Sequence, residues 1–246
     1  MSLASTKTFF IRVSEVNPNR RIGLASLWQL MQEAAWENAA SLKASTYDLQ
    51  KRGITWVMSR GRIEVFRYPK HRETITVETW PSGQERSFLY RDYRVYDAEG
   101  TLIAQATTTW LVLDFEERKM VSVPQDLGDI LLTPEEKPPL ERSRGKMSLP
   151  DPKHAGTLIP VQFHDLDINQ HVNNSRYIRW LLESQAKQLL AGKQVRLLEF
   201  QLRAECLLGN QLRSVADWDP EQQAYRHAIW RVADGKIISQ GRSVWE

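Results

Sequence analysis

The sequence predicts an α+β protein made of two tandem units, each with one long helix packed on an antiparallel sheet, joined within one chain as a pseudo-dimer. Three observations predict this fold. The two halves of the chain resemble each other, each half places an amphipathic helix before several alternating strands, and a proline-rich stretch separates the halves. The 246 residues suffice for such a core without disulfide bonds.

The internal repeat is clearest near the end of each half. Residues 97–110 and 232–245 align at an offset of 135, which pairs Gly100 with Gly235 and Trp110 with Trp245. Near the start of each half the offset is about 148, and it shrinks along the chain because the first half carries longer loops. Two copies of one unit of about 100 to 120 residues are therefore predicted.

The first copy opens with a short strand and a helix. Ser26 and Gln29 have the spacing of a capping box. Apolar residues follow at helical spacing: Leu27, Leu30, Met31, Ala34 and Ala35. Alternating runs then predict strands over residues 54–66, 73–80, 86–97 and 101–114. Short turns such as Glu99-Gly100 favour antiparallel pairing of these strands.

The segment 124–159 is predicted to be a linker between a unit over residues 1–123 and a unit over residues 160–246. Seven of the eleven prolines lie between Pro124 and Pro160, and the segment lacks sustained periodicity.

The second copy repeats the plan of the first. Asn173 or Asn174 can cap its helix. The apolar stripe of that helix consists of Tyr177, Ile178, Leu181, Leu182, Ala186 and Leu189. Strands are predicted over residues 195–206, 212–219, 224–232 and 236–245.

Composition excludes several classes of protein. The single cysteine, Cys206, rules out a disulfide framework and a cysteine-rich zinc site. Apolar runs are too short for a membrane helix and the N-terminus has no signal layout, so we expect a reducing, cytoplasmic location and no membrane partner. The net charge of +3 comes without a basic stripe, so nucleic acid is not an expected partner. Scattered basic clusters, such as residues 142–146, leave room for docking of an acidic partner.

The richest polar cluster is HDLDINQHVNN, residues 164–174, between the first strand and the helix of the second copy. Turn formation and helix capping suffice to explain Asp165, Asn173 and Asn174, because Asp and Asn are common at both kinds of position. No such explanation covers the alternating residues inside the cluster.

Those alternating residues are Asp167, Asn169 and His171, whose side chains would point to one spot beside a helix N-terminus if the stretch is extended. A carboxylate, an amide and an imidazole offer a base, a hydrogen-bond donor and a proton carrier. The helix N-terminus can stabilise developing negative charge. At an offset near 148, the matching residues of the first copy are Asn19, Arg21 and Gly23. The trio therefore occurs in one copy only.

The run D-x-N-x-H-V-N-N, followed by Tyr177 and Trp180, resembles the hot-dog-fold thioesterases, and most closely the acyl-ACP thioesterases. Residues 56–60, 63–69 and 77–80 are similar to the same family at matching positions. The resemblance covers essentially the whole chain. It implies a tandem hot-dog fold and hydrolysis of the thioester between a fatty acyl chain and the phosphopantetheine arm of acyl carrier protein, without a metal or another cofactor.

The resemblance assigns catalytic roles to Asp167, Asn169, His171 and Glu205. It also brings Cys206 to a position considered as a nucleophile in this family. In FQLRAEC, residues 200–206, alternation puts Cys206 on the apolar face and Glu205 on the other, so Cys206 is predicted to be a core residue. A surface ion pair with Arg203 is the alternative for Glu205.

In the implied mechanism a water molecule attacks the thioester. Asn169 orients the carbonyl or the water, Glu205 takes the proton, His171 shares in proton transfer and Asp167 fixes geometry and charge. Backbone N–H groups near Asn173 would hold the oxyanion. The sequence leaves open whether Glu205 or His171 is the base, and whether an acyl-glutamate forms.

The first copy, which lacks this chemistry, is left to bind the acyl chain. Candidates for a tunnel wall are Trp28, Met31, Trp36, Trp56 and Met58. A place in a plain helix–sheet core is favoured over the tunnel wall for each of these residues, because stripes of this kind ordinarily make the helix–sheet contact. Asn173 and Asn174 are the candidates for substrate contacts beside the catalytic residues.

Three other functions fit parts of the sequence. A hydratase of the tandem fold would carry D-x-N-P-x-H, which the sequence lacks. An acyl-CoA thioesterase shares the motif and differs only in the carrier. A non-catalytic acyl-binding module would lose one of the four polar residues, and all four are present. The sequence leaves open the preferred acyl chain and the formation of a homodimer.

Overall fold

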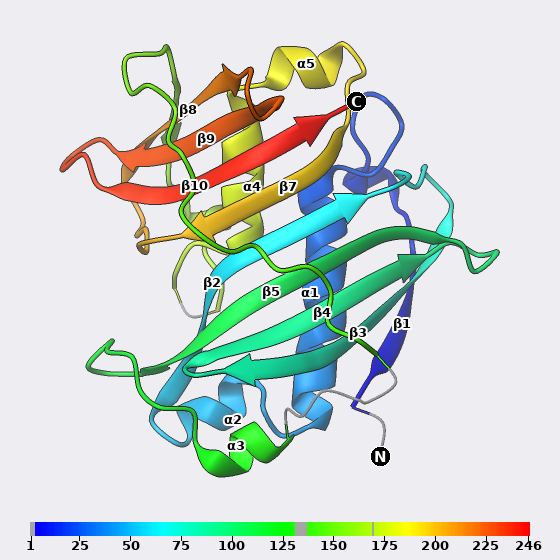
Figure 1. Ribbon diagram of the computed structural model, residues 1–246, viewed down its shortest axis with the longest axis vertical. Coiled ribbons are helices and arrows are strands. Elements are labelled where there is room, and N and C mark those ends of the chain that lie inside the picture. The colour runs from blue at the N-terminus through cyan, green and yellow to red at the C-terminus, as the bar shows by residue number, and fades with distance from the viewer. Residues whose placement is uncertain (1–2, 131–136, 169) are drawn as a thin grey trace.

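The computed structural model describes residues 3–130, 137–168 and 170–246. In this part of the chain one continuous antiparallel sheet of ten strands runs in the order β1-β3-β4-β5-β2-β7-β10-β9-β8-β6 (Figure 1). The second five strands repeat the first five in mirrored order. The predicted pair of α+β units within one chain is therefore confirmed.

The first unit holds five strands and the longest helix. Its elements are β1 (Ser5–Phe10), the 3-10 turn η1 (Val13–Glu15), α1 (Leu24–Ser41), α2 (Thr46–Gln50), β2 (Ile54–Val65), β3 (Thr74–Glu85), β4 (Phe88–Tyr96) and β5 (Leu102–Asp114). The helix α1 starts earlier than the capping-box spacing predicts. Gly23 is its N-cap, and Ser26 lies inside the first turn. The amide of Gln29 is engaged elsewhere, because it donates to Oγ of Ser175 at 3.0 Å.

The second unit follows α3 (Gln125–Ile130) and the linker. Its elements are β6 (Thr157–Pro160), η2 (Phe163–Asp165), α4 (Asn174–Glu183), α5 (Ala186–Leu190), β7 (Val195–Leu202), β8 (Gln211–Asp219), β9 (Ala224–Arg231) and β10 (Ile237–Trp245). The predicted helix is split in two, since α4 ends where the Ser184 hydroxyl bonds back to the Leu181 carbonyl. The strand β7 ends at Leu202, four residues before the predicted end.

Both long helices cover the same face of the sheet (Figure 1). Leu27 and Met31 of α1 join Ile178 and Leu181 of α4 in one buried hydrophobic cluster that spans the two units. Helical spacing brings these apolar side chains to one side of each helix. Because this hydrophobic core is shared, we expect the two units to fold as one body rather than as two independent domains.

The two units meet where β2 pairs with β7. Gly61 lies opposite Phe200 in this antiparallel pair. The Phe200 ring packs edge-on against Trp28 of α1, with ring centroids 5.2 Å apart. A Cβ atom at position 61 would lie 2.5 Å from the Phe200 ring and 2.7 Å from Trp28. Glycine is therefore required here so that the aromatic pair can sit on the strand.

The linker crosses the face of the sheet opposite to the helices (Figure 1). The backbone N–H of Leu140 donates to Oδ2 of the buried Asp92 at 2.8 Å. The guanidinium of Arg142 stacks 3.6 Å from the centre of the Tyr90 ring, and Arg60 donates to the Gly145 carbonyl at 2.8 Å. These contacts make the second half of the linker an ordered strap. Among the described residues, no helix is both long and apolar enough to cross a lipid bilayer.

Candidate active site

The polar cluster of the second unit folds into a tight turn rather than an extended stretch. Leu166 and Val172 form an antiparallel bridge, and the N–H of Asp167 donates to the His171 carbonyl at 2.8 Å. Gln170 adopts a left-handed backbone with φ 60°, which reverses the chain. Asp167 and His171 are thereby opposite each other across the turn, where side chains lie on the same side. The predicted Asn169 lies outside the described residues.

The turn also corrects the alignment of the two copies. The turns Val13–Glu15 and Phe163–Asp165, the bridges Val16↔Ile22 and Leu166↔Val172, and the N-caps Gly23 and Asn173 all match at an offset of 150 rather than 148. The first-copy residues that match Asp167, Asn169 and His171 are therefore Asn17, Asn19 and Arg21. The carboxylate and the imidazole are still present in the second copy only.

Flanking polar residues build the turn and the helix start, as their capping role predicts. The Asp165 carboxylate accepts from the Gln162 N–H at 2.9 Å and pairs with Arg176 at 3.4 Å. The Asn173 side chain caps α4 by accepting from the Ser175 N–H at 2.9 Å. Asn174 is the first residue of α4 and is half-buried.

The start of α4 has fewer donors to offer an oxyanion than the sequence suggests. The N–H groups of Asn173, Ser175 and Arg176 already donate, to the Asp165 carbonyl, the Asn173 side chain and the Asn173 carbonyl. Among the described residues at this end of the helix, Asn174 is thus left as the one whose backbone N–H could donate to an oxyanion.

Glu205 reaches the turn from the loop after β7. Its Oε2 lies 3.5 Å from Nε2 of His171, and its Oε1 accepts from the guanidinium of Arg118 in the first unit. The Glu205 carboxylate therefore bridges an imidazole and an arginine. The alternative for Glu205 is a surface ion pair with Arg203, but the ion pair described is with Arg118 of the first unit. The strand β7 ends at Leu202, so alternation no longer fixes which side chains share a face at residues 203–205.

His171 is two-thirds buried, and its environment favours the uncharged imidazole. Partial burial and the neighbouring charge of Arg118 lower the pKa of His171, while the Asp167 carboxylate acts in the opposite direction. An imidazole uncharged near neutral pH can accept a proton. The site thus combines carboxylates on either side of a proton acceptor.

Cys206 belongs to the hydrophobic core rather than to this polar cluster. Its side chain is fully buried in the hydrophobic core, and burial raises the pKa of its thiol to about 11. A thiol with that pKa is almost wholly protonated at neutral pH and is a poor nucleophile. The predicted core position of Cys206 is confirmed.

A cavity of about 740 Å³ lies between α1 and the sheet and connects the two units. It reaches from Trp56 and Leu89 in the first unit to Asp167, Ile168 and Asn173 in the second. In the first unit its wall combines apolar side chains, among them Trp56 and Trp110 packed edge-on, with polar ones such as Gln32 and Arg91. A volume of this size suits a chain-like or drug-sized ligand.

The tunnel-wall residues expected from the sequence divide into two groups. Trp36 and Trp56 line the cavity. Trp28, Met31 and Met58 are buried in the core and are not part of the cavity wall. The apolar stripe of a helix packed on a sheet faces the core, so periodicity alone does not separate the two groups.

Two contacts between the units are not predictable from local sequence. Gln29 of α1 donates to the Ser175 hydroxyl, which in turn donates to the Asn173 side chain at 2.8 Å, so a polar chain links the two units beside the cavity. Arg118 belongs to a surface turn of charged residues, and no local pattern distinguishes it. Both contacts depend on how the units pair.

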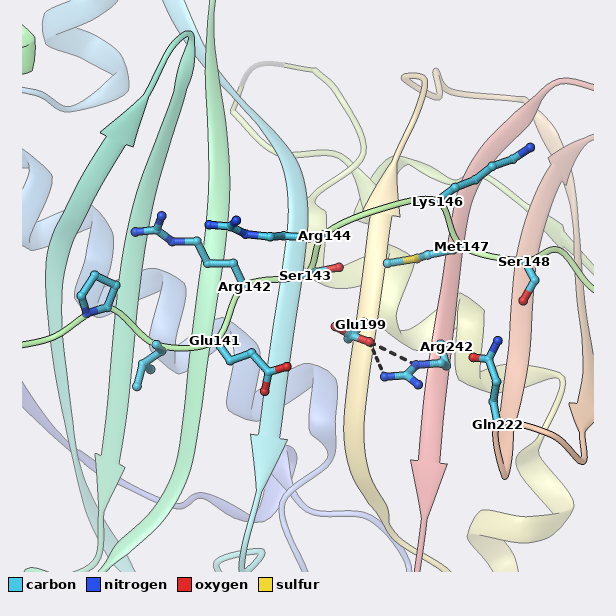
Figure 2. A pocket seen from close by; sticks show the side chains of 12 residues that line it. Glu141, Arg142, Ser143, Arg144, Lys146, Met147, Ser148, Glu199, Gln222 and Arg242 are labelled. Carbon is cyan, nitrogen blue, oxygen red and sulfur yellow. Dashed lines mark hydrogen bonds and ion pairs between the residues drawn. The ribbon is translucent and has the colours of Figure 1, made fainter.

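A second hollow of about 730 Å³ lies on the other face of the sheet, under the strap. Figure 2 shows the basic side chains of Arg142, Arg144 and Lys146 along its rim and the ion pair of Glu199 with Arg242 below. The described residues that line it include no histidine, so they offer no carboxylate–imidazole pair. Among the described residues, no group of histidine, cysteine, aspartate and glutamate side chains could hold a metal ion.

Two helix-on-sheet units that share one continuous antiparallel sheet define a tandem hot-dog protein. Residues 3–131 match the acyl-ACP thioesterase N-terminal domain, and residues 150–246 match the acyl-ACP thioesterase C-terminal domain. The chain belongs to the acyl-ACP thioesterase family.

Individual relatives agree with this assignment. The acyl-[acyl-carrier-protein] hydrolase FATB3 of Cuphea viscosissima is 29% identical over 97% of this chain and 61% of its own length. The oleoyl-acyl carrier protein thioesterase of Coriandrum sativum is 31% identical over 83% of this chain and 60% of its own length. The chain thus spans about three fifths of the length of these curated relatives.

Solved structures share the fold over the full chain. An acyl-ACP thioesterase from Bacteroides thetaiotaomicron superposes with a TM-score of 0.87 at 25% identity, covering 100% of both chains. The 12:0-ACP thioesterase from Umbellularia californica superposes with a TM-score of 0.84 at 23% identity, covering 100% of this chain and 98% of its own.

Proposed function

We propose that this protein hydrolyses the thioester of fatty acyl-[acyl-carrier-protein], which releases the free fatty acid and ends chain elongation. The observation that carries the proposal is one turn, Leu166–Val172. Its Asp167 lines one end of the cavity between the units, and its His171 faces Glu205. Family membership and the names of the relatives support the carrier protein as the source of the acyl chain.

The proposed reaction needs only a water molecule, because a thioester is already activated. Glu205 takes the proton from the attacking water as the water oxygen bonds to the acyl carbon, and the uncharged His171 shares in proton transfer. When the C–S bond then breaks, the proton passes to the pantetheine sulfur, which leaves as a thiol. Asp167 holds the local charge and geometry, and Asn169 orients the substrate carbonyl or the water. The N–H of Asn174, at the positive end of α4, is the backbone donor proposed for the oxyanion.

The two units divide the work in this proposal. The unit over residues 1–123 holds the acyl chain in the part of the cavity lined by Trp56, Leu89 and Trp110. The unit over residues 160–246 carries the catalytic residues, and residues 124–159 connect the two.

A reducing, cytoplasmic location and a homodimer remain predictions. The names of the plant relatives include the word chloroplastic, which concerns the location of those proteins. Light scattering after gel filtration tests whether this protein forms a homodimer.

A thioester panel tests the function. Purified protein is offered C8 to C18 acyl chains on acyl carrier protein and on CoA, and free acid is measured. We expect faster release from the carrier protein at every accepted length. Equal or faster release from CoA would instead favour the acyl-CoA thioesterase. Binding of acyl chains without release would favour the non-catalytic module.

Salt separates carrier docking from chemistry in the same assay. Carrier proteins of this kind are acidic, and the basic residues of this chain outnumber its acidic ones by 33 to 30. We expect kcat/KM for the carrier substrate to fall as salt rises past about 0.1 M, where the Debye length is about 10 Å. The CoA substrate serves as the comparison. A flat profile on the carrier protein would remove electrostatic docking but not hydrolysis.

A further inference from the structure

A turn of the first unit brings an arginine to the candidate site of the second. The turn follows β5, and the carboxylate of Asp114 shapes it by accepting from the N–H groups of Glu116 at 3.0 Å and Glu117 at 2.7 Å. The N–H of Phe115 donates to the Gly53 carbonyl at 2.9 Å, which anchors the turn to the start of β2. Arg118, at the end of this turn, has a left-handed backbone with φ 54°.

The side chain of Arg118 crosses to the second unit and contacts Glu205. Its guanidinium donates to Oε1 of Glu205, while the other carboxylate oxygen faces His171 at 3.5 Å. The loop that carries Glu205 has left the sheet, since β7 ends at Leu202, and the Glu205 side chain is 44% exposed. A glutamate on such a loop has several rotamers available, and holding it in one of them costs conformational entropy.

We propose that Arg118 is a positioning residue for the hydrolysis, which holds Oε1 of Glu205 so that Oε2 stays directed at His171. The inference rests on the proposed function and adds that one unit orients the general base of the other. Arginine suits this role because its guanidinium is planar and does not lose its charge in the working pH range.

The charges around His171 agree with this assignment. Asp167 lies across the turn and Glu205 faces the ring, so two carboxylates adjoin the imidazole. Both would draw a proton onto it. Arg118 supplies the opposing positive charge and helps to lower the pKa of His171. Removing Arg118 should therefore raise the pKa of His171 as well as free the carboxylate.

The test uses Arg118→Gly, because glycine accepts the left-handed backbone at this position and the turn should persist. We expect kcat to fall about 10- to 100-fold, the scale of a misplaced catalytic group, with KM nearly unchanged. The acid limb of the profile of kcat/KM against pH should move to higher pH.

The variant Arg118→Lys keeps a positive charge but lacks the planar guanidinium, and it should recover part of the rate. Lys119→Ala is the control, since that neighbour is 77% exposed and pairs with Glu117.

Two readouts separate positioning from other roles. In a Glu205→Gln background, Arg118→Gly should lower the rate less than twofold further, because the group it positions is gone. NMR titration of His171, identified with a His171→Gln sample, should show a higher pKa in Arg118→Gly. This second readout does not depend on turnover.

The outcomes also separate this inference from the proposed function. Hydrolysis by the wild type with unchanged kcat, pH profile and His171 titration in Arg118→Gly overturns the positioning role alone. A loss confined to KM on carrier protein, reversed by salt and absent on CoA, would make Arg118 a docking residue instead. No hydrolysis by the wild type on any thioester overturns the proposed function, and an unshifted His171 titration would then overturn the inference separately.

Discussion

Adjacent residues Glu205 and Cys206 have opposite surroundings, and this decides which one can act in hydrolysis. Glu205 contacts His171 and Arg118, whereas Cys206 is fully buried with a thiol pKa of about 11. We expect Cys206→Ala to keep most activity and Glu205→Gln to lose about 10² to 10⁴ in rate. Free-acid release by both variants, with folding checked by circular dichroism, measures this. A folded but inactive Cys206→Ala beside an active Glu205→Gln would reverse the assignment.

His227 makes stability depend on pH through a single buried side chain. Its Nδ1 lies 2.9 Å from the Leu181 carbonyl and its Nε2 lies 2.6 Å from Oγ of Ser243, so the uncharged ring bridges α4 and β10. Burial lowers the pKa of His227 to about 4. Because the unfolded chain then binds a proton more readily, the stabilisation is fully present above about pH 6.5 and is lost as the pH falls toward 4.

The loss should reach about 3 kcal/mol at the acid end of that window. Urea unfolding at pH 7.5, 6 and 5 measures it as a falling midpoint. The variant His227→Gln removes the titrating group, so its own midpoint should change less over the same range. Parallel acid dependence in the variant and the wild type would assign the effect to other groups.

At the level of elements, side chains of α1 form one wall of the cavity, so their size sets how much room an acyl chain has. Ala39 of α1 lines the cavity, whereas Met31 on the same helix is buried in the core. We expect Ala39→Leu to shorten the accepted acyl chain, lowering the rate on the longest good substrate about tenfold or more relative to shorter ones. Met31→Leu, which keeps the volume, should leave the product profile unchanged. Gas chromatography of the released acids measures the product profile of both variants. A changed profile in Met31→Leu but not in Ala39→Leu would mean that the acyl chain binds on the side of α1 that carries Met31.

The elements themselves follow largely from local sequence. Alternation and turn residues are enough to predict β2, β4, β5, β8, β9 and β10 to within one or two residues. Local rules fail where a partner from elsewhere intervenes. Gln29 looks like half of a capping box, but its amide bonds to Ser175 in the other unit. Residues 203–206 continue the alternation of β7, but the chain leaves the sheet at Leu202.

The candidate site is predictable in part for the same reason. Alternation within the polar cluster predicts Asp167 and His171, the family resemblance adds Glu205, and two of their contacts are now described. The reversal of the chain between Asp167 and His171 depends on the bridge of Leu166 with Val172, which alternation does not reveal. Arg118 lies 87 residues from Glu205 in sequence, so only the pairing of the units brings them together.

At the scale of the whole molecule, the shared sheet and core predict one cooperative unfolding transition. Gly61 sits at the centre of the junction, where a Cβ would overlap the ring of Phe200. We expect Gly61→Ala to lower stability by about 1 to 3 kcal/mol, the cost of overpacking a dense core. Circular dichroism and tryptophan fluorescence should still report a single, coincident midpoint. Separate transitions for the two probes would mean that the units unfold independently.

The two turns match in position at an offset of 150 but carry different residues. This difference has a consequence for how the sequence of such a protein can evolve. In a pair of identical subunits every substitution is made twice, so a residue that helps one half is imposed on the other. Joining the halves in one chain removes that coupling. Asn17 accepts from the Arg21 N–H and the Arg21 guanidinium donates to the Tyr68 carbonyl, so both residues hold their own half together, while Asp167 and His171 take the proposed catalytic roles at the matching positions. In a fused chain, the half proposed to hold the acyl chain can therefore change without altering the residues proposed for catalysis.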